Sequence, residues 1–87
     1  MSRRLILVGD PTTHGGVVLS GSPTSTLGDD LKPIARLGDL VDCPRHGTNK
    51  IIEGAANYTI NGIPAALEGH HTECGSVLIA TGSSSVG

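Results

Sequence analysis

All the histidine and cysteine residues of this 87-residue chain stand in or beside one recurring phrase. The phrase opens with Gly, usually followed by Asp, and ends a few residues later on His or Cys. Its three versions occupy residues 9–15, 38–43 and 69–75. Imidazole and thiolate groups are the ligands that zinc and other soft metal ions prefer in proteins. The sequence therefore predicts a metal site where the ends of the three phrases meet.

Four ligands complete a closed, tetrahedral zinc site. If the phrases are equivalent, His14, Cys43 and Cys74 lie at one level around a common axis. His46 follows Cys43 by three residues, the spacing with which a tight turn chelates one ion. The favoured ligand set is therefore His14, Cys43, His46 and Cys74.

A competing set replaces Cys43 with His70 or His71. His70 stands where the other two phrases have Asp10 and Asp39, which are expected to cap backbone amides in Asx turns. His70 is therefore a candidate turn residue, or a hydrogen-bond donor to a metal ligand. Adjacent side chains of an extended segment point to opposite sides. Each of these two histidines, taken alone, is therefore expected to face solvent, and at most one of them reaches the metal.

Three readings compete for the two cysteines: a disulfide, buried thiols and a metal site. No secretory signal precedes them, so a reducing compartment and a metal site are favoured. A catalytic zinc needs an open position and a carboxylate base, but neither His-Glu-x-x-His nor a deaminase signature is present. We expect one structural zinc ion and no enzymatic activity.

Short β-branched runs bounded by Gly, Pro, Asn or Ser must position the ligands. They occupy residues 5–8, 16–19, 50–53, 58–60 and 76–79, and they are typical of strands. Asn61-Gly62 predicts a tight hairpin turn. No segment shows a capped helical stripe. The fold class is therefore all-β, and the extra N-terminal strand completes the truncated third copy to close a pseudo-threefold ring.

The composition predicts one small domain, residues 1–87, with a light core. Trp and Phe are absent, and Tyr58 is the one aromatic residue. A domain with such a core needs an additional source of stability, and the bound metal is the candidate. Glycines followed by small residues at equivalent places (Gly21, Gly54 and Gly82) indicate either close backbone approach or turns. A formal net charge of −2 and scattered basic residues argue against nucleic acid as a partner. No apolar stretch approaches the length of a membrane span, so stable membrane insertion is not expected.

In combination and order, these motifs resemble the PAAR-repeat family, whose members cap the VgrG spike of the bacterial type VI secretion system. The resemblance covers nearly the whole chain. Its motifs are Gly-Asp-Pro-Thr-Thr-His-Gly-Gly at 9–16, Pro-Ile-Ala-Arg at 33–36, Gly-Asp-Leu-Val-Asp-Cys-Pro-Arg-His-Gly at 38–47, Pro-Ala-Ala-Leu at 64–67 and His-Thr-Glu-Cys-Gly at 71–75.

The resemblance implies a short, pseudo-threefold cone of β-hairpins with zinc near its apex. Its base would sit on a VgrG trimer, with one tip per trimer. It also implies synthesis in the bacterial cytoplasm and secretion by the type VI system into target cells without a signal peptide. A chain of 87 residues has no room for a toxin extension, so we expect an orphan tip that sharpens the spike and helps to dock effector proteins. The alternatives are a small zinc-dependent toxin enzyme and a free-standing zinc-stabilised binding module.

Overall fold

The computed structural model describes residues 3–22, 26–27, 32–81 and 85–86, which form short strands and no helix. The all-β prediction is therefore confirmed. The strands are β1 (Arg3–Arg4), β2 (Val17–Val18), β3 (Thr26–Leu27), β4 (Lys32–Pro33), β5 (Leu40–Cys43), β6 (Gly47–Lys50), β7 (Thr59–Ile60), β8 (Ile63–Pro64) and β9 (Ser85–Val86). The described residues thus contain no helix long and apolar enough to cross a membrane.

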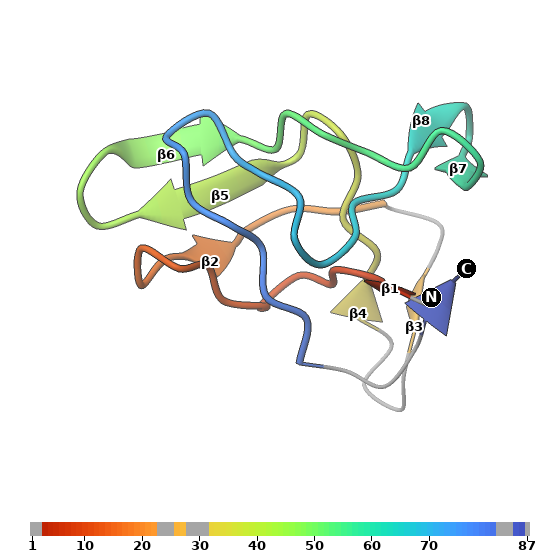
Figure 1. Cartoon of the computed structure of the whole chain (residues 1–87), viewed down its shortest axis with the longest axis horizontal. Coiled ribbons are helices and arrows are strands. Elements are labelled where there is room, and N and C mark those ends of the chain that lie inside the picture. Colours follow the sequence, from red (N-terminus) through yellow and green to blue (C-terminus); the bar gives the residue numbers. More distant parts are fainter. Residues whose placement is uncertain (1–2, 23–25, 28–31, 82–84, 87) are drawn as a thin grey trace.

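All strand pairs are antiparallel, and they divide between the two ends of the molecule (Figure 1). At one end β2, β5 and β6 form a three-stranded sheet in the order β2-β5-β6. Toward the other end lie the pairs β3-β4, β7-β8 and β1-β9, which we call the base hairpins. The turn between β7 and β8 is the expected Asn61-Gly62 turn, with positive φ at both residues (53° and 83°).

Closed rings of backbone hydrogen bonds relate the three copies by pseudo-threefold symmetry. Ile6 donates its N–H to the Ala66 carbonyl (3.0 Å), Ala66 to Ala35 (2.9 Å) and Ala35 to Ile6 (2.8 Å). A second ring of three bonds links the copies in the opposite order: Leu19 donates to Leu40, Ile52 to His71 and Ile79 to Pro11. Since each copy bonds to both of the others, the predicted pseudo-threefold ring is confirmed.

The two chain termini together supply one of the three base hairpins. Strand β1, close to the N-terminus, pairs with β9, close to the C-terminus (Figure 1). The segment after β1 continues into the ring through isolated bridges from Leu5 to Leu67 and from Leu7 to Ile34. The N-terminal segment therefore completes the third copy, as the sequence predicts, although its regular strand begins at Arg3, before the predicted run.

Two clusters of small aliphatic side chains make up the core, as expected for a chain almost without aromatics. The first cluster contains Ile6, Val18, Ala35, Val41, Ile51, Ala66, Leu78 and Ala80. The second contains Leu5, Leu7, Ile34, Ala55, Ile60, Ala65 and Leu67, with the partly buried Tyr58 packed against it. Several members occupy equivalent positions in the three copies, so each copy contributes to a shared core that none could form alone.

Two of the predicted crowded glycines lie against the backbone of a following segment. A Cβ atom at Gly54 would lie 2.6 Å from the Pro64 Cβ, and one at Gly21 would lie 2.8 Å from the Ile34 carbonyl oxygen. Distances this short exclude a side chain, so close backbone approach accounts for both residues better than a simple turn. The third residue of this set, Gly82, lies outside the described residues.

Candidate metal centre

Each Gly phrase opens with a tight turn that is capped by the residue following the glycine. The Asp10 Oδ2 atom accepts the Leu7 N–H at 2.9 Å, and the Asp39 Oδ2 atom accepts the Arg36 N–H at 2.7 Å. The glycines of the three turns have φ angles of 95°, 89° and 88°, in the left-handed region that favours Gly: Gly9, Gly38 and Gly69. The predicted capping role of the two aspartates is therefore confirmed.

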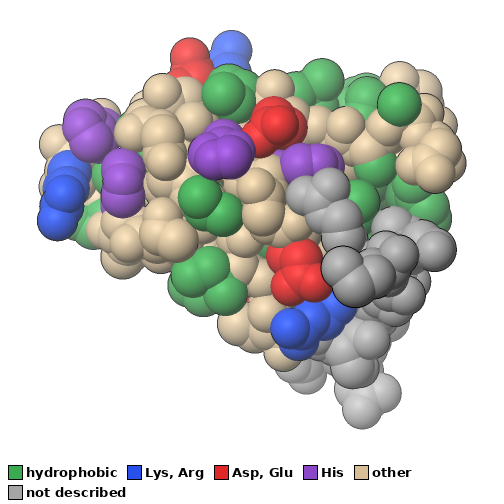
Figure 2. Space-filling model, viewed as in Figure 1, with side chains coloured by type: hydrophobic (Ala, Val, Ile, Leu, Met, Phe, Trp, Pro, Cys, Tyr) green, Lys and Arg blue, Asp and Glu red, His purple; other side chains and the backbone are tan. Residues whose placement is uncertain are grey.

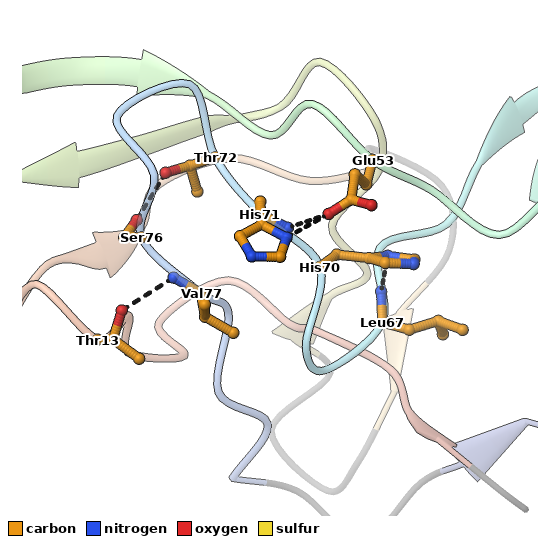
Figure 3. A network of polar contacts seen from close by, with 8 residues as sticks. All are labelled: Thr13, Glu53, Leu67, His70, His71, Thr72, Ser76 and Val77. Carbon is orange, nitrogen blue, oxygen red and sulfur yellow. Dashed lines mark hydrogen bonds and ion pairs between the residues drawn. The ribbon is translucent and has the colours of Figure 1, made fainter.

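His70 is the capping residue of the third turn. It is buried (8% exposed), and its Nδ1 atom accepts the Leu67 N–H at 3.0 Å, as the aspartates do in the other copies (Figure 3). The prediction that His70 faces solvent is wrong, because its backbone position requires an inward-pointing acceptor for this amide. His71 does face solvent, and its N–H and Nδ1 lie 2.7 and 2.6 Å from the Glu53 Oε1 atom.

The Glu53 carboxylate is held in its charged form by these contacts. The side-chain hydrogen bond with His71 is the main reason that the pKa of Glu53 lies below its ordinary value of 4.5, and the His71 backbone N–H adds to it. Smaller electrostatic interactions with His71 and His70 lower this pKa further. His70 and His71 therefore have partners at the side of the molecule, around Glu53 and Leu67 (Figure 3).

The favoured ligand set comes together at one end of the molecule. The possible ligand atoms of four residues all lie within 4.8 Å of one another: His14, Cys43, His46 and Cys74. His14 lies in the loop before β2, Cys43 ends β5, and His46 lies in the β5–β6 turn. In the surface view some histidine side chains lie together at this end, and others lie nearer the middle of the face (Figure 2). His70 and His71 are not part of this group.

The distances within the group fit a tetrahedral zinc ion. The Cys43 Sγ atom lies 3.6 Å from His14 Nδ1 and 3.5 Å from His46 Nδ1, and the Cys74 Sγ atom lies 3.6 Å from His14 Nδ1. Zn–S bonds of about 2.3 Å and Zn–N bonds of about 2.05 Å that meet at the tetrahedral angle place S and N about 3.6 Å apart. Two thiolates and two imidazoles also match the donor set of structural zinc sites.

The surroundings of Cys74 prepare its sulfur to bind a cation. Burial raises the pKa of the Cys74 thiol, but hydrogen bonds with Thr72, with the side chain and backbone of Ser76, and with His14 outweigh burial and lower this pKa from 9.0 to about 5. The Thr72 Oγ1 atom lies 3.2 Å from the sulfur, and the Ser76 Oγ atom lies 3.5 Å from it. At neutral pH the sulfur is therefore a thiolate, the form that binds metal.

Comparison with known proteins now identifies the family. The PAAR motif model matches residues 8–80, which span most of the 87-residue chain. The chain belongs to the PAAR-motif family. This membership agrees with the type VI spike-tip family that its motifs resemble and with the possible metal site formed by its His and Cys residues. No curated protein gives a significant match to the chain.

The residues around Cys74 were not singled out by the sequence. Thr72 and Ser76 place hydroxyl groups at its sulfur, and the Asn49 Oδ1 atom accepts the Cys74 N–H at 3.3 Å. The repeat carried one signal, because Thr72 recurs as Thr12 at the equivalent position of the first copy. Asn49 had no such signal, since it reaches Cys74 only through the placement of β6 beside the third copy.

We expect His70→Ala to destabilise the fold without removing metal. The substitution leaves the buried Leu67 N–H without its acceptor, which costs about 1–3 kcal/mol of unfolding free energy. His70→Asn keeps a neutral acceptor and should recover most of this loss, whereas His71→Ala should be nearly silent. Urea unfolding and the metal content per chain measure both effects. Metal loss in either alanine variant would show that the histidine concerned is a ligand.

Proposed function

We propose that this protein is the structural tip that caps the trimeric VgrG spike of a type VI secretion system. The observation that carries the proposal is the pair of closed hydrogen-bond rings, which give one chain three nearly equivalent sides. Family membership over residues 8–80 supports the same function. A single tip of this kind would sharpen the spike for membrane puncture.

Internal triplication suits a monomer that binds the end of a trimer. Three identical chains present three identical surfaces, and a partner without internal repeats could match only one of them. The base hairpins β3-β4, β7-β8 and β1-β9 supply three antiparallel pairs at the end away from the candidate metal centre. We propose that these hairpins contact the three VgrG chains and cover the open strand edges at the end of the spike.

The metal centre has a structural part in this proposal. Residues 1–87 act as a single PAAR domain in which His14, Cys43, His46 and Cys74 bind one zinc ion at the end opposite the base. The fit of the S–N distances to a tetrahedral ion supports the ligand set. When bound, zinc links all three copies, because each copy contributes at least one of the four residues.

Exposed aliphatic side chains are the proposed contacts for separate effector proteins. They include Leu19, Leu37, Leu40, Ile52 and Ile79. Two of them are neighbours, because the Leu19 N–H donates to the Leu40 carbonyl oxygen at 2.8 Å. We propose that the tip is made in the bacterial cytoplasm, binds VgrG and effectors there, and leaves with the spike without a signal peptide.

We expect the purified protein to bind a VgrG trimer with one tip per three chains. A pseudo-threefold monomer occupies the whole threefold end, so a second copy has no site. The contact is expected to be largely apolar and to weaken little between low and high salt. Light scattering of the isolated complex at both ionic strengths measures its mass. Three tips per trimer, or dissociation on adding salt, would contradict this mode of capping.

A matched pair of substitutions tests which end of the protein binds. Thr59 in β7 and Thr48 in β6 are both exposed threonines on strands, at opposite ends of the molecule (Figure 1). Thr59→Lys puts a charge into the proposed contact and should weaken binding by about tenfold or more, since buried unpaired charges cost several kcal/mol. Thr48→Lys should bind as the unchanged protein does. Equal effects of the two substitutions would argue against capping by the base hairpins.

A further inference from the structure

The two cysteines of the metal centre differ in what surrounds their sulfur atoms. Cys43 is buried (2% exposed), and its Sγ atom contacts imidazole nitrogens of His14 and His46. The Cys74 Sγ atom contacts His14 but also lies 3.2 Å from Thr72 Oγ1 and 3.5 Å from Ser76 Oγ. Within the described part of the chain, hydroxyl groups therefore face the sulfur of Cys74 and not that of Cys43.

Thr72 and Ser76, which we call the hydroxyl pair, are buried side by side. Their Oγ atoms lie 2.6 Å apart, and the two residues are 1% and 0% exposed (Figure 3). When Cys74 binds a metal ion its sulfur is a thiolate, which has no proton to donate, so the hydroxyl groups must then be the donors. The two hydroxyl groups have one proton each, but they make three short contacts: one with each other and one each with the sulfur. The arrangement that uses the two shortest has Ser76 donating to Thr72 and Thr72 donating to the sulfur, which strengthens the Thr72 hydrogen bond.

The hydroxyl pair belongs to the third copy and is not required by the repeat itself. In the first copy the Thr12 Oγ1 atom accepts the Gly16 N–H at 3.1 Å and serves the loop backbone. Gly16 stands where the third copy has Ser76, and a Cβ atom at Gly16 would lie 1.9 Å from the Asp42 carbonyl oxygen. The second copy has Val41 at the threonine position. Only in the third copy does the residue at this position, Thr72, lie within hydrogen-bond distance of a ligand sulfur.

We propose that Thr72 and Ser76 are positioning residues for Cys74, and that their O–H···S hydrogen bond makes Cys74 a weaker electron donor to the metal than Cys43. Hydrogen bonds from outside the ligand set orient a ligand and alter its basicity, which changes how strongly it binds the ion. Donation from the hydroxyl draws electron density from the sulfur. The inference rests on the proposed metal site, and it adds a difference between its two thiolates.

Cobalt(II) binding to the full chain tests the proposal, because the sulfur-to-cobalt charge-transfer band reports the donor strength of the thiolates. Thr72→Val keeps the shape of the side chain but removes its O–H. We expect its metal affinity to fall by about tenfold or more because Cys74 is no longer held in position. Its charge-transfer band should move to lower energy because the sulfur, without the hydrogen bond, becomes a stronger donor. Thr72→Ser keeps the hydroxyl and should retain the original band. Ser76→Ala, at a position where the first copy has Gly, should give a smaller shift in the same direction.

Thr12→Val is the matched control, since it removes a buried threonine hydroxyl that contacts no ligand sulfur. It should lower thermal stability and leave the band unchanged. An unchanged band and affinity in Thr72→Val, or an equal band shift in Thr12→Val, would overturn the positioning role. If the unchanged protein binds neither cobalt nor zinc, the metal site itself is wrong. These results are distinguishable because the last one appears before any substitution is made.

Discussion

Removal of the metal by a strong chelator is expected to unfold this protein at room temperature. Structural zinc contributes on the order of 10 kcal/mol to the folding of small domains. The whole unfolding free energy of a natural domain is only about 5–15 kcal/mol. The two core clusters consist of small aliphatic residues with one partly buried tyrosine, so they cannot replace the contribution of the metal. Circular dichroism and thermal melting with and without chelator measure the effect.

The chelation experiment has two controls. A reductant must be present throughout, because the free Cys43 and Cys74 have sulfur atoms within 4.8 Å of each other and could be oxidised once the metal leaves. Returning equimolar zinc should restore the fold. An unchanged melting temperature in protein confirmed to be free of metal would show that the hydrogen-bond rings hold the three copies together without a metal.

The repeat and the turns could be predicted from the sequence because they depend on local chemistry. Gly9 and Gly38 supply positive φ, and Asp10 and Asp39 cap amides three residues earlier in the chain. Such a turn is determined within a few residues. The three phrases therefore indicated both the pseudo-threefold ring and the residues that gather at its end, although not the identity of the ion they bind.

The strands were harder to predict because most contain only two residues. A two-residue strand has no alternation of polar and apolar residues that a pattern could detect. Strand β5 was missed for another reason, since residues 40–43 had been interpreted as part of a ligand phrase. Its pairing with β2 depends on a segment from another copy, whereas β5 and β6 form a local hairpin. The predicted run at 50–53 overlaps β6 only at Lys50.

His70 shows why residue type alone was misleading. A histidine near other histidines and cysteines suggests a ligand, but the turn needs an acceptor at this position, and neutral imidazole provides one through Nδ1. Asp10 and Asp39, which accept the equivalent amides in the other two copies, were the signal that the residue at position 70 caps a turn. Glu53 lies close enough to His70 for the two side chains to interact electrostatically. A carboxylate at position 70 would repel Glu53, whereas a histidine does not.

Loss of any one ligand is expected to remove most of the bound metal and most of the stability that depends on it. Cys74→Ser and His46→Ala should lose metal and stability, and His14→Ala nearly as much. His14 Nδ1 lies 3.6 Å from both sulfur atoms, so it stands between the two thiolates. A closed site with three remaining ligands admits water and no longer links the copies firmly. Metal content and urea unfolding of each variant measure the two effects.

Arg45→Ala is the control for substitutions in the β5–β6 turn. Arg45 is exposed and lies between Cys43 and His46 in the sequence, yet it is not in the ligand group. This variant should keep its metal and unfold at nearly the same urea concentration as the unchanged protein. If the Cys74→Ser protein still held one zinc ion per chain, the ligand assignment would be wrong. The link from the third copy to the metal centre would then have to come from another residue.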